Sequence, residues 1–503
     1  MNQLKKGAIL SYLNIILTNV VGLVLTPFII RSLGDSEYGL YTLIGAFVGY
    51  LSIMDLGLNN TIVRYVAKYR AENNKKKEED FLGTSLMMYG GISLIVMIFG
   101  LSLYSNIENI FGETLNPEQI SKAKLMMLLL VFNLMVSIPG GSFAAICNAY
   151  EHFVFPRAMN VIKYVLRSVL VITVLYQGAD SVGLVLLDTI LNVFFILISY
   201  FYVKNNLKII FRFHKMNKRF IFEIFSYSMW IFLFAVTEQI LWKGGQFIIG
   251  TKSDPSQVGI YAIGIVLGSY YAAFSGAISN LFLPKAIQMI VKKTSSIELT
   301  FQMTKIARFS LFSLMLIFIE FLLLGRQFVS LWVGKNYIES YYIAVIVMIG
   351  YTTPLIQKFA NSILEAKNLF KYNALIYLGC IVLGMLSSLF LVEKFGVIGV
   401  ISGIATGWII AQIIMNVFFV KKLGLDIILF FKLTAKGLVF VFVLTLVVSF
   451  LITQIVLFKV GWLDFMIKAV LIGIVYICSL YTIGMNTQEK GMIVSLIKHY
   501  LKP

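Results

Sequence analysis

The sequence has 503 residues, of which 59% are hydrophobic and only 13% are charged, and its mean hydropathy is +0.87. A soluble protein of this length needs far more charge to cover its surface, so the composition excludes a soluble globular chain and indicates a membrane protein. The formal net charge of +18 at pH 7 could suggest nucleic acid as a partner, but the distribution of the charges along the chain gives another explanation.

Long apolar runs follow one another along the chain. A helix needs about 20 residues to cross a hydrocarbon core of about 30 Å. The first run follows Lys5 and Lys6 and continues to Ile30 without a small-residue cleavage site, so we interpret it as a retained span and not as a signal peptide. We predict an all-α polytopic membrane protein with about 14 transmembrane helices, near residues 8–30, 39–60, 81–104, 123–149, 157–177, 181–203, 222–250, 257–283, 303–325, 341–366, 372–392, 396–420, 433–456 and 464–485.

Basic residues are distributed unequally between alternate connections. If the N-terminus is cytoplasmic, the inner segments hold 26 lysine and arginine residues and the outer segments hold 7. The positive-inside rule then places both termini in the cytoplasm, and it explains the net charge without nucleic acid. The inner segments 61–80 and 204–221, which we predict to be loops, are rich in lysine and suit the anionic headgroups of membrane lipids.

A short pattern occurs twice in the chain. FIIRSLGDSEYGLY at 28–41 recurs as FIIGTKSDPSQVGIY at 247–261, and with one inserted residue seven of fifteen positions coincide. Six predicted spans separate the copies, so both halves cross the membrane in the same direction. We predict two six-helix bundles related by a parallel internal repeat, with the substrate site between them. The corresponding domains are 1–220 and 221–425 for the bundles and 426–503 for two extra helices and a cytoplasmic tail.

Two cations lie in the predicted fifth span. At about 1.5 Å per residue, Lys163 and Arg167 are ~9 Å and ~15 Å from its cytoplasmic end. Because they are four residues apart, they share a helix face and repel each other unless an anion lies there. Lys163 can also extend to the cytoplasmic interface, whereas Arg167 is too deep to do so. The pair favours a phosphate-bearing ligand, to which arginine offers bidentate contact.

Other charges interrupt the apolar segments, and they are functional candidates because a charge at the centre of a membrane helix costs ~2.5–3.5 kcal/mol. As substrate-binding residues we predict, besides the two cations above, Arg31 at the external mouth of the cavity, Arg64 and Lys243. As coupling or charge-balancing residues we predict Asp55, Asp188, Glu238 and Glu320. For these carboxylates two interpretations remain open, which are neutralisation of a buried cation and coupling to H⁺ or Na⁺.

The sequence offers little for catalysis. The three histidines and three cysteines are too scattered to form a metal site, a catalytic triad or a disulfide framework. GGQFIIGTKS at 244–253 is not a phosphate-binding loop, because the lysine does not directly follow Gly250. We predict no cofactor. The acidic segment Asp35-Ser36-Glu37 would suit a membrane glycosyltransferase, but its loop of about eight residues is short for such an enzyme.

Two stretches carry a family resemblance. LGDSEYGLY at 33–41 and MDLGLNNTIVRYVAKY at 54–69, followed by the lysine-rich segment, resemble the polysaccharide transporter family. These are the Wzx-type oligosaccharide flippases of the multidrug/oligosaccharidyl-lipid/polysaccharide exporter superfamily. The resemblance covers the whole chain in length, span count and halved architecture, and it is most specific over residues 20–80.

The resemblance implies a function. Family members are multi-pass proteins of the bacterial cytoplasmic membrane, and they are not enzymes. They flip a polyprenyl-pyrophosphate-linked oligosaccharide from the inner to the outer leaflet by alternating access through a cationic cavity. Polysaccharide polymerases and glycosyltransferases are the implied partners. The chain lacks the arginine-aspartate pair within span 1 that is associated with lipid II flippases, which argues against a peptidoglycan precursor as cargo.

We therefore expect a lipid-linked oligosaccharide flippase. Buried cations would hold the pyrophosphate, and residues such as Tyr164, Tyr270 and Tyr271 would contact sugars. A cation-coupled multidrug antiporter of the same superfamily is the alternative, although it predicts an acidic cavity and usually twelve spans. A membrane polymerase or glycosyltransferase is a third hypothesis, against which the absence of a large external loop argues.

Overall fold

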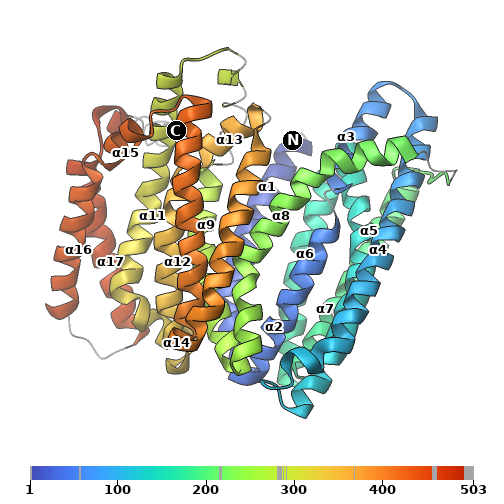
Figure 1. Cartoon of the computed structure of the whole chain (residues 1–503), viewed down its shortest axis with the longest axis horizontal. Helices are drawn as coiled ribbons and strands as arrows, with labels where there is room; N and C mark the ends of the chain where they lie inside the picture. Colours follow the sequence, from blue (N-terminus) through green and yellow to red (C-terminus); the bar gives the residue numbers. More distant parts are fainter. Residues whose placement is uncertain are drawn as a thin grey trace, which may run out of the picture. The chain divides into compact units, whose positions relative to one another are not determined.

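The described part of the chain is helical throughout (Figure 1). The computed structural model describes residues 3–55, 58–213, 218–279, 286, 288–290, 292–367, 369–455 and 461–491, and these contain no β-strand. Ten of their helical segments are long and apolar enough to cross a membrane, and Leu17–Leu33 is a shorter apolar stretch. Together with α1 (Gln3–Leu33), α2 (Asp35–Ser52) and α8 (Lys218–Lys252), and with α14 (Phe370–Phe418) counted on each side of its bend, they correspond to the predicted spans. The chain is an all-helical, multi-pass membrane protein.

The chain divides into two compact units. Unit 1 comprises Met1–Ala262 and Val392–Gly396, and unit 2 comprises Ile263–Leu391 and Val397–Pro503. The division falls within α9 (Pro255–Ser279). The domain boundaries that we derived from the internal repeat stay a prediction.

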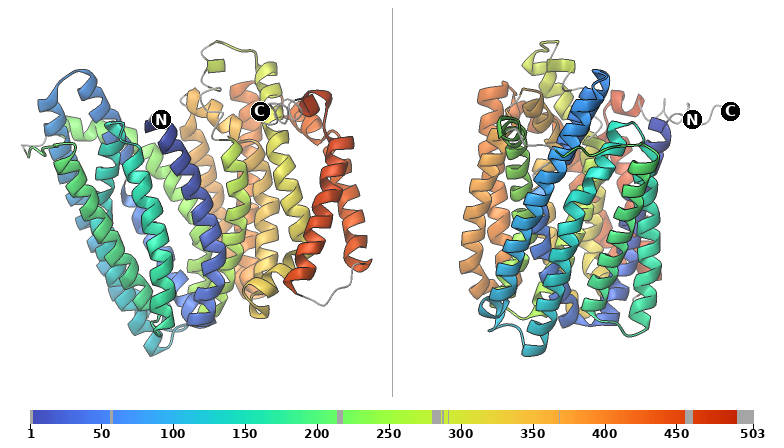
Figure 2. Two further views of the ribbon diagram at one scale, coloured as in Figure 1. Left: turned by 180° about the vertical axis from the view of Figure 1, so that it is seen from behind. Right: turned by 90° about the vertical axis from the view of Figure 1, so that its right-hand side faces the viewer.

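Unit 1 contains most of the predicted site residues. After α2 come η1 (Ile53–Asp55), α3 (Leu58–Ala71), α4 (Lys75–Phe111), α5 (Pro117–Ala149), α6 (Val154–Tyr176) and α7 (Ser181–Asn205). α5 packs against α4 and α7 (Figure 1), and α1 packs against α6 (Figure 2). α2 packs against α5 and α8, and its Leu40, Leu43 and Ile44 are fully buried. α2 therefore lies in the interior of the unit.

Polar residues set the starts of these helices. Asn116 and Gln119 form a capping box at α5, in which each side chain accepts a hydrogen bond from the other residue's backbone N–H at 2.9 Å. Asp180 caps α7 by accepting from the backbone of Val182 and Gly183. These contacts satisfy N–H groups that have no partner within the helix. They also position Lys122, one turn after Gln119, and Ser181, which directly follows Asp180.

Unit 2 continues from α9 through a series of helices. These are α11 (Ser296–Trp332), η2 (Lys335–Tyr337), α12 (Glu339–Ile356), α13 (Lys358–Ala366), α14, η3 (Phe419–Leu423), α15 (Ile427–Ala435), α16 (Leu438–Ile455), α17 (Trp462–Ser479) and η4 (Leu480–Gly484). α14 bends at Gly396, where φ is +55°. An apolar cluster that includes Ile319, Val441 and Ile472 joins α11, α16 and α17.

Three predicted segments differ from the structure. The span predicted over 39–60 ends at Ser52, and α3 is a separate helix. The segment 61–80, which we predicted to be a loop, is largely helical, because the buried Leu58, Ile62 and Val66 repeat every four residues and form an apolar stripe. The span predicted over 341–366 breaks into α12 and α13 shortly after Pro354, which cannot donate a backbone hydrogen bond.

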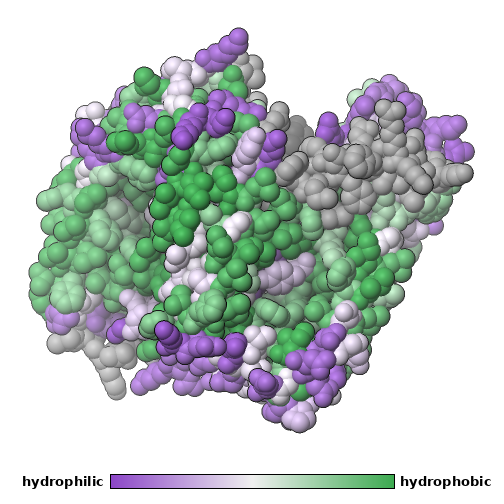
Figure 3. Space-filling model, viewed as in Figure 1, coloured by the Kyte–Doolittle hydropathy of each residue, from purple (hydrophilic) through white to green (hydrophobic). Residues whose placement is uncertain are grey.

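The surface of each unit fits a membrane. On the face drawn in Figure 3, hydrophobic residues cover the middle of the helices and hydrophilic residues gather towards their ends. Large apolar side chains are widely exposed, among them Val24 and Ile98 in unit 1 and Phe390 and Ile413 in unit 2. Such side chains are stable in contact with lipid, and exposed patches of this kind mark membrane contact.

Both copies of the repeat form the same helical hairpin. α1 ends at Leu33, Gly34 turns the chain with φ +81°, and α2 begins at Asp35. α8 ends at Lys252, and α9 begins at Pro255, 220 residues after the start of α2. Gly39 and Gly259 are also 220 residues apart, and they lie against each other within unit 1. A Cβ atom on Gly259 would lie 3.5 Å from the Cα of Gly39.

The Gly39→Ala substitution tests this contact. Its methyl carbon would lie 1.6 Å from the carbonyl oxygen of Pro255, so we expect α2 and α9 to be forced apart. The expected loss of stability is about 1–3 kcal/mol, which lowers the Tm of the purified protein in detergent. Gly45→Ala in the same helix is the matched control, because nothing lies within 4 Å of its added carbon. Equal melting temperatures for the two variants would contradict the close approach.

Candidate functional site

A bidentate ion pair joins α6 to α7 in unit 1. Arg167 Nε lies 2.5 Å from Asp188 Oδ1, and Nη2 lies 2.8 Å from Oδ2. Both side chains are only one quarter exposed. The Tyr41 hydroxyl of α2 lies beside the pair. The geometry matches the two parallel hydrogen bonds that a guanidinium group forms best with a carboxylate. The charge of Arg167 is therefore neutralised within the protein.

Lys163, one turn earlier in α6, has a neutral partner instead. Its Nζ donates to Oδ1 of Asn192 at 2.6 Å. Asn192 donates in turn to Oδ1 of Asn133 at 2.6 Å and to the hydroxyl of Ser137, both on α5. Among the described side chains no carboxylate lies within ion-pair distance of Lys163, although Asp188 attracts it from farther away. Lys163, Arg167 and Asp188 together carry one positive charge in excess.

The two contacts share one register. Arg167 and Lys163 are four residues apart on α6, and their partners Asp188 and Asn192 are four residues apart on α7. Side chains with this spacing lie on one face of a helix. Because the short connection 177–180 makes α6 and α7 antiparallel, the two polar faces meet as successive rungs. A span held in this way presents Lys163 at a fixed depth.

Lys243 is a second cation for which the described residues supply no counter-charge. It lies on α8, where its Cγ would be 3.8 Å from a Cβ atom on Gly49 of α2. The side chain is partly buried, and no described residue forms a hydrogen bond or an ion pair with its ammonium group. Glu238, on the same helix, accepts a hydrogen bond from Trp242 at 3.2 Å. Helix α2 thus passes the Arg167 pair at Tyr41 and Lys243 at Gly49, about 12 Å apart along its axis.

The remaining predicted residues lie elsewhere. Arg31 is exposed in the last turn of α1, and Arg64 is exposed on α3. Asp55 ends η1, and its side chain lies outside the described residues. Glu320 belongs to α11 of unit 2, where its Oε1 would lie 3.8 Å from a Cβ atom on Gly473. Tyr271, also in unit 2, hydrogen-bonds Thr352 at 2.7 Å. Of the predicted set, the described contacts bring Lys163, Arg167 and Asp188 together.

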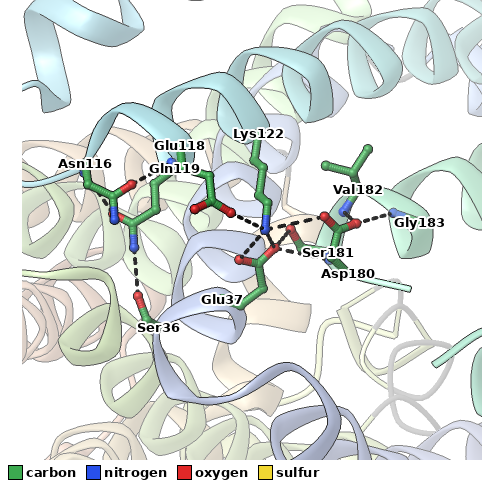
Figure 4. A network of polar contacts seen from close by, with 10 residues as sticks. All are labelled: Ser36, Glu37, Asn116, Glu118, Gln119, Lys122, Asp180, Ser181, Val182 and Gly183. Atoms are coloured by element: carbon green, nitrogen blue, oxygen red, sulfur yellow. Dashed lines mark hydrogen bonds and ion pairs between the residues drawn. The ribbon is translucent and has the colours of Figure 1, made fainter. Parts of the chain in front are cut away.

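The acidic segment that begins α2 has a structural role. The ammonium group of Lys122 lies 3.2 Å from Glu37, 3.3 Å from Glu118 and 3.4 Å from Asp180 (Figure 4). Glu37 also accepts hydrogen bonds from the backbone N–H and the hydroxyl of Ser181, at 3.3 and 2.6 Å. Its carboxylate therefore ties the ends of α2, α5 and α7 together. Because these contacts occupy its carboxylate, we interpret Glu37 as a structural residue and not as a catalytic acid.

Several buried or partly buried polar groups were not predicted from the sequence. Tyr41, Asn133, Ser137 and Asn192 all contact the cations of α6 or their partners. In unit 2, Lys468 pairs with the buried Asp464 at 2.9 Å. A sequence pattern could have identified three of them. Asn133 and Ser137 are polar residues four apart within an apolar span, and Asn192 lies four residues after Asp188 in another. Over the described residues, no group of three or more His, Cys, Asp or Glu side chains forms a metal site.

Comparisons with known proteins are consistent with this architecture. The model of the family described as "Polysaccharide biosynthesis protein" matches residues 4–274, more than half of the chain. A Shigella flexneri protein named "Putative O-antigen transporter" is 24% identical over 389 residues, which are 74% of this chain and 87% of the relative.

Solved structures share the fold. The structure named "Lipid II flippase MurJ, inward closed conformation" has a TM-score of 0.71 at 17% identity, over 94% of this chain and 97% of that chain. An inward-facing multidrug resistance MATE family transporter of the MOP superfamily has a TM-score of 0.59 at 13% identity, over 80% and 97%. At these identities the likeness shows the fold alone, which is that of MurJ and the MATE transporters.

Removal of Asp188 tests the ion pair. Asp188→Ala leaves the Arg167 cation without its carboxylate inside a membrane helix, and breaking a buried pair in this way costs about 3–5 kcal/mol, less where the pair is partly solvated. We expect Asp188→Ala to lower the Tm of the purified protein more than the double variant Arg167→Met/Asp188→Leu does. Glu118→Ala removes a carboxylate that is 78% exposed and is the matched control. If the double variant lost as much stability as the two single substitutions together, the pairing would be contradicted.

Proposed function

The chain belongs to the polysaccharide biosynthesis protein family, and from this premise we propose that it is a flippase for a polyprenyl-pyrophosphate-linked oligosaccharide. It moves this lipid from the inner to the outer leaflet of the bacterial cytoplasmic membrane by alternating access, with both termini in the cytoplasm. The relative named for O-antigen transport and the fold shared with a lipid II flippase support a lipid-linked cargo.

The observation that carries the proposal is the cation of Lys163. An ammonium group within a membrane span is unfavourable unless an anion accompanies it. Among the described residues its partner is the neutral amide oxygen of Asn192, and the nearby carboxylate of Asp188 already neutralises Arg167. Lys163 is therefore available to a phosphate group, which an ammonium group binds through charge-assisted hydrogen bonds. Lys243, which has no counter-charge among the described residues, is the second phosphate contact.

Arg167 has a different role in this proposal. From the sequence we expected its guanidinium group to bind the substrate directly. The bidentate pair with Asp188 occupies that group, so we assign Arg167 and Asp188 to holding α6 and α7 in register. They are positioning residues that set the depth of Lys163.

The amide network next to Lys163 suits the first sugar. Asn133, Asn192 and Ser137 offer hydrogen-bond donors and acceptors from two helices. Sugars present hydroxyl groups in a fixed arrangement, and a few well-placed polar side chains recognise them. Tyr164, on the same helix as Lys163, adds an aromatic ring. Phosphate recognition on α6 and saccharide recognition by the neighbouring residues of α5 and α7 would then be adjacent.

Glu320 is the proposed coupling residue. It is a partly buried carboxyl group on α11 of unit 2, and no described residue forms an ion pair or a hydrogen bond with it. A lone carboxylate in a low-dielectric region is costly, and a proton removes the cost. We therefore propose that Glu320 takes up and releases a proton during the transport cycle.

Substitution of Lys163 tests the phosphate contact. Lys163→Gln keeps the hydrogen-bonding capacity but removes the charge, so we expect purified protein to bind farnesyl pyrophosphate 10- to 100-fold more weakly, the loss of one charge-assisted hydrogen bond of about 1.5–3 kcal/mol. Lys163→Arg retains the charge and is expected to keep most of the affinity. Titration followed by intrinsic tryptophan fluorescence measures both.

Lys204→Gln provides the control, since this lysine is exposed at the end of α7. Farnesol, which lacks the pyrophosphate, is expected to bind wild type and Lys163→Gln equally. Unchanged affinity of Lys163→Gln for farnesyl pyrophosphate, at an unchanged Tm, would rule out this role for Lys163.

Glu320→Gln fixes the side chain in its neutral state. We expect the variant to fold and to lose the response of transport to a pH gradient, because no proton is released from the amide. The measurement is flipping of a fluorescent polyprenyl-pyrophosphate saccharide in proteoliposomes, with and without the gradient. Glu393→Gln, an exposed carboxyl whose side chain is 67% accessible, should respond as wild type does. A Glu320→Gln variant with the full wild-type response would exclude Glu320 as the coupling site.

A further inference from the structure

A pocket of about 820 Å³ opens in unit 2 at the end predicted to be cytoplasmic. Its walls come from the first turns of α11, the junction between α15 and α16, and the segment after η4. We call it the α11–α15 pocket. It lies in a different unit from Lys163 and Lys243, and nothing in the proposed transport step uses it.

A clamp around Arg308 builds one wall of this pocket. Arg308 is 5% exposed, and its guanidinium group binds Glu489 through two hydrogen bonds of 2.6 and 3.1 Å. It also donates to the backbone carbonyl oxygens of four residues, which are Leu433, Thr434, Lys436 and Gly484. All the hydrogen-bonding capacity of Arg308 is thus used within the protein, so it fixes the wall and is not available to a ligand.

Two cations of the α11–α15 pocket remain available. Lys305 on α11 is partly buried, and Lys436 follows α15 and is exposed. No described residue forms an ion pair or a side-chain hydrogen bond with either ammonium group. Gln302, Asn486 and Gln488 add amide groups. Among the described residues of the lining, the carboxylates are Glu298, exposed at the start of α11, and the engaged Glu489. The excess of positive charge and of hydrogen-bond donors in the lining favours an anion with several acceptor oxygens, such as a phosphate ester.

Apolar residues beside these cations indicate that the anion belongs to a lipid. Phe301 and Ile483 line the pocket and are 51% and 44% exposed. Ile428 and Phe431 of α15 are 83% and 38% exposed, on a nine-residue helix that also carries Lys432. A short helix with exposed apolar residues and a lysine is typical of the membrane interface. Basic pockets between helices at this level suit anionic lipid headgroups.

From these observations we propose that the α11–α15 pocket binds the phosphate headgroup of an anionic glycerophospholipid from the inner leaflet. Lys305 and Lys436 bind the phosphate, the three amides bind the remaining headgroup oxygens, and Phe301 and Ile483 contact the start of an acyl chain. The hydrogen bonds of Arg308 hold α11, the junction after α15 and the segment after η4 together, and they thereby fix the lining residues of the pocket.

The test compares lipid binding by two double-substitution variants, each measured in detergent and in lipid nanodiscs. Lys305→Gln/Lys436→Gln removes both charges of the pocket. Lys421→Gln/Lys422→Gln removes two exposed lysines of η3 in the same unit and is the matched control. Native mass spectrometry counts bound phosphatidylglycerol or phosphatidylcholine, and the Tm reports stabilisation by each lipid.

We expect wild type and the control to bind phosphatidylglycerol in preference to phosphatidylcholine and to be stabilised by it. The pocket variant should bind phosphatidylglycerol about 30-fold more weakly, as expected for two lysines near an anionic headgroup. Without added lipid its Tm should equal that of wild type, and Lys305→Arg/Lys436→Arg should restore binding.

Several results would overturn the proposal. One is equal phosphatidylglycerol binding by the pocket variant and wild type. Another is equal stabilisation of wild type by inorganic phosphate, which would assign the pocket to a free anion. Displacement of phosphatidylglycerol by farnesyl pyrophosphate at low concentration would assign it to the lipid-linked cargo instead. A pocket variant that keeps wild-type affinity for farnesyl pyrophosphate separates this site from Lys163.

Discussion

A charge in hydrocarbon must be neutralised or shared, and this constraint organises unit 1. Arg167 and Asp188 meet because neither is stable alone at that depth, and their bidentate contact fixes the register of α6 against α7. Once that register is set, Lys163 falls opposite Asn192, and Asn192 meets Asn133 and Ser137 of α5. A single ion pair thus determines which polar groups of three spans are brought together.

The same constraint separates structural charges from functional ones. In unit 2, Arg308 is satisfied by Glu489 and four carbonyl oxygens, and Lys468 is satisfied by Asp464, which also accepts a hydrogen bond from Gln327 at 2.8 Å. Such groups hold helices together, and their substitution would disturb the fold first. Lys163, Lys243 and Glu320 differ, because the described residues supply no opposite charge within contact distance. An anionic ligand can neutralise the two lysines, and a proton can neutralise Glu320, which removes the free-energy cost of a charge in a low-dielectric region.

The features that depend on local composition could be predicted from the sequence. The membrane spans followed from apolar runs, because lipid contact requires long stretches without charge. α3 was missed because its apolar stripe at Leu58, Ile62 and Val66 is shorter than a span and is interrupted by charge. Asn133, Ser137 and Asn192 could have been found, since each belongs to a polar pair spaced by four residues. The Arg308–Glu489 contact could not, because 181 residues separate its partners and only the tertiary fold brings them together.

α14, which bends at Gly396, forms a helical hairpin without polar rungs like those of unit 1. In the predicted internal repeat α14 corresponds to α6 and α7, and its two predicted spans, 372–392 and 396–420, contain no charged residue. There the two arms approach through small residues: a Cβ on Gly384 would lie 2.8 Å from the carbonyl oxygen of Gly403, and Ser388 donates to the carbonyl of Val400 at 2.8 Å. Small residues suffice to pack helices in a membrane. The arms of α14 pack without charges, so a hairpin of this kind does not require an ion pair; this favours a role of Arg167 and Asp188 in placing Lys163 where it can bind an anion.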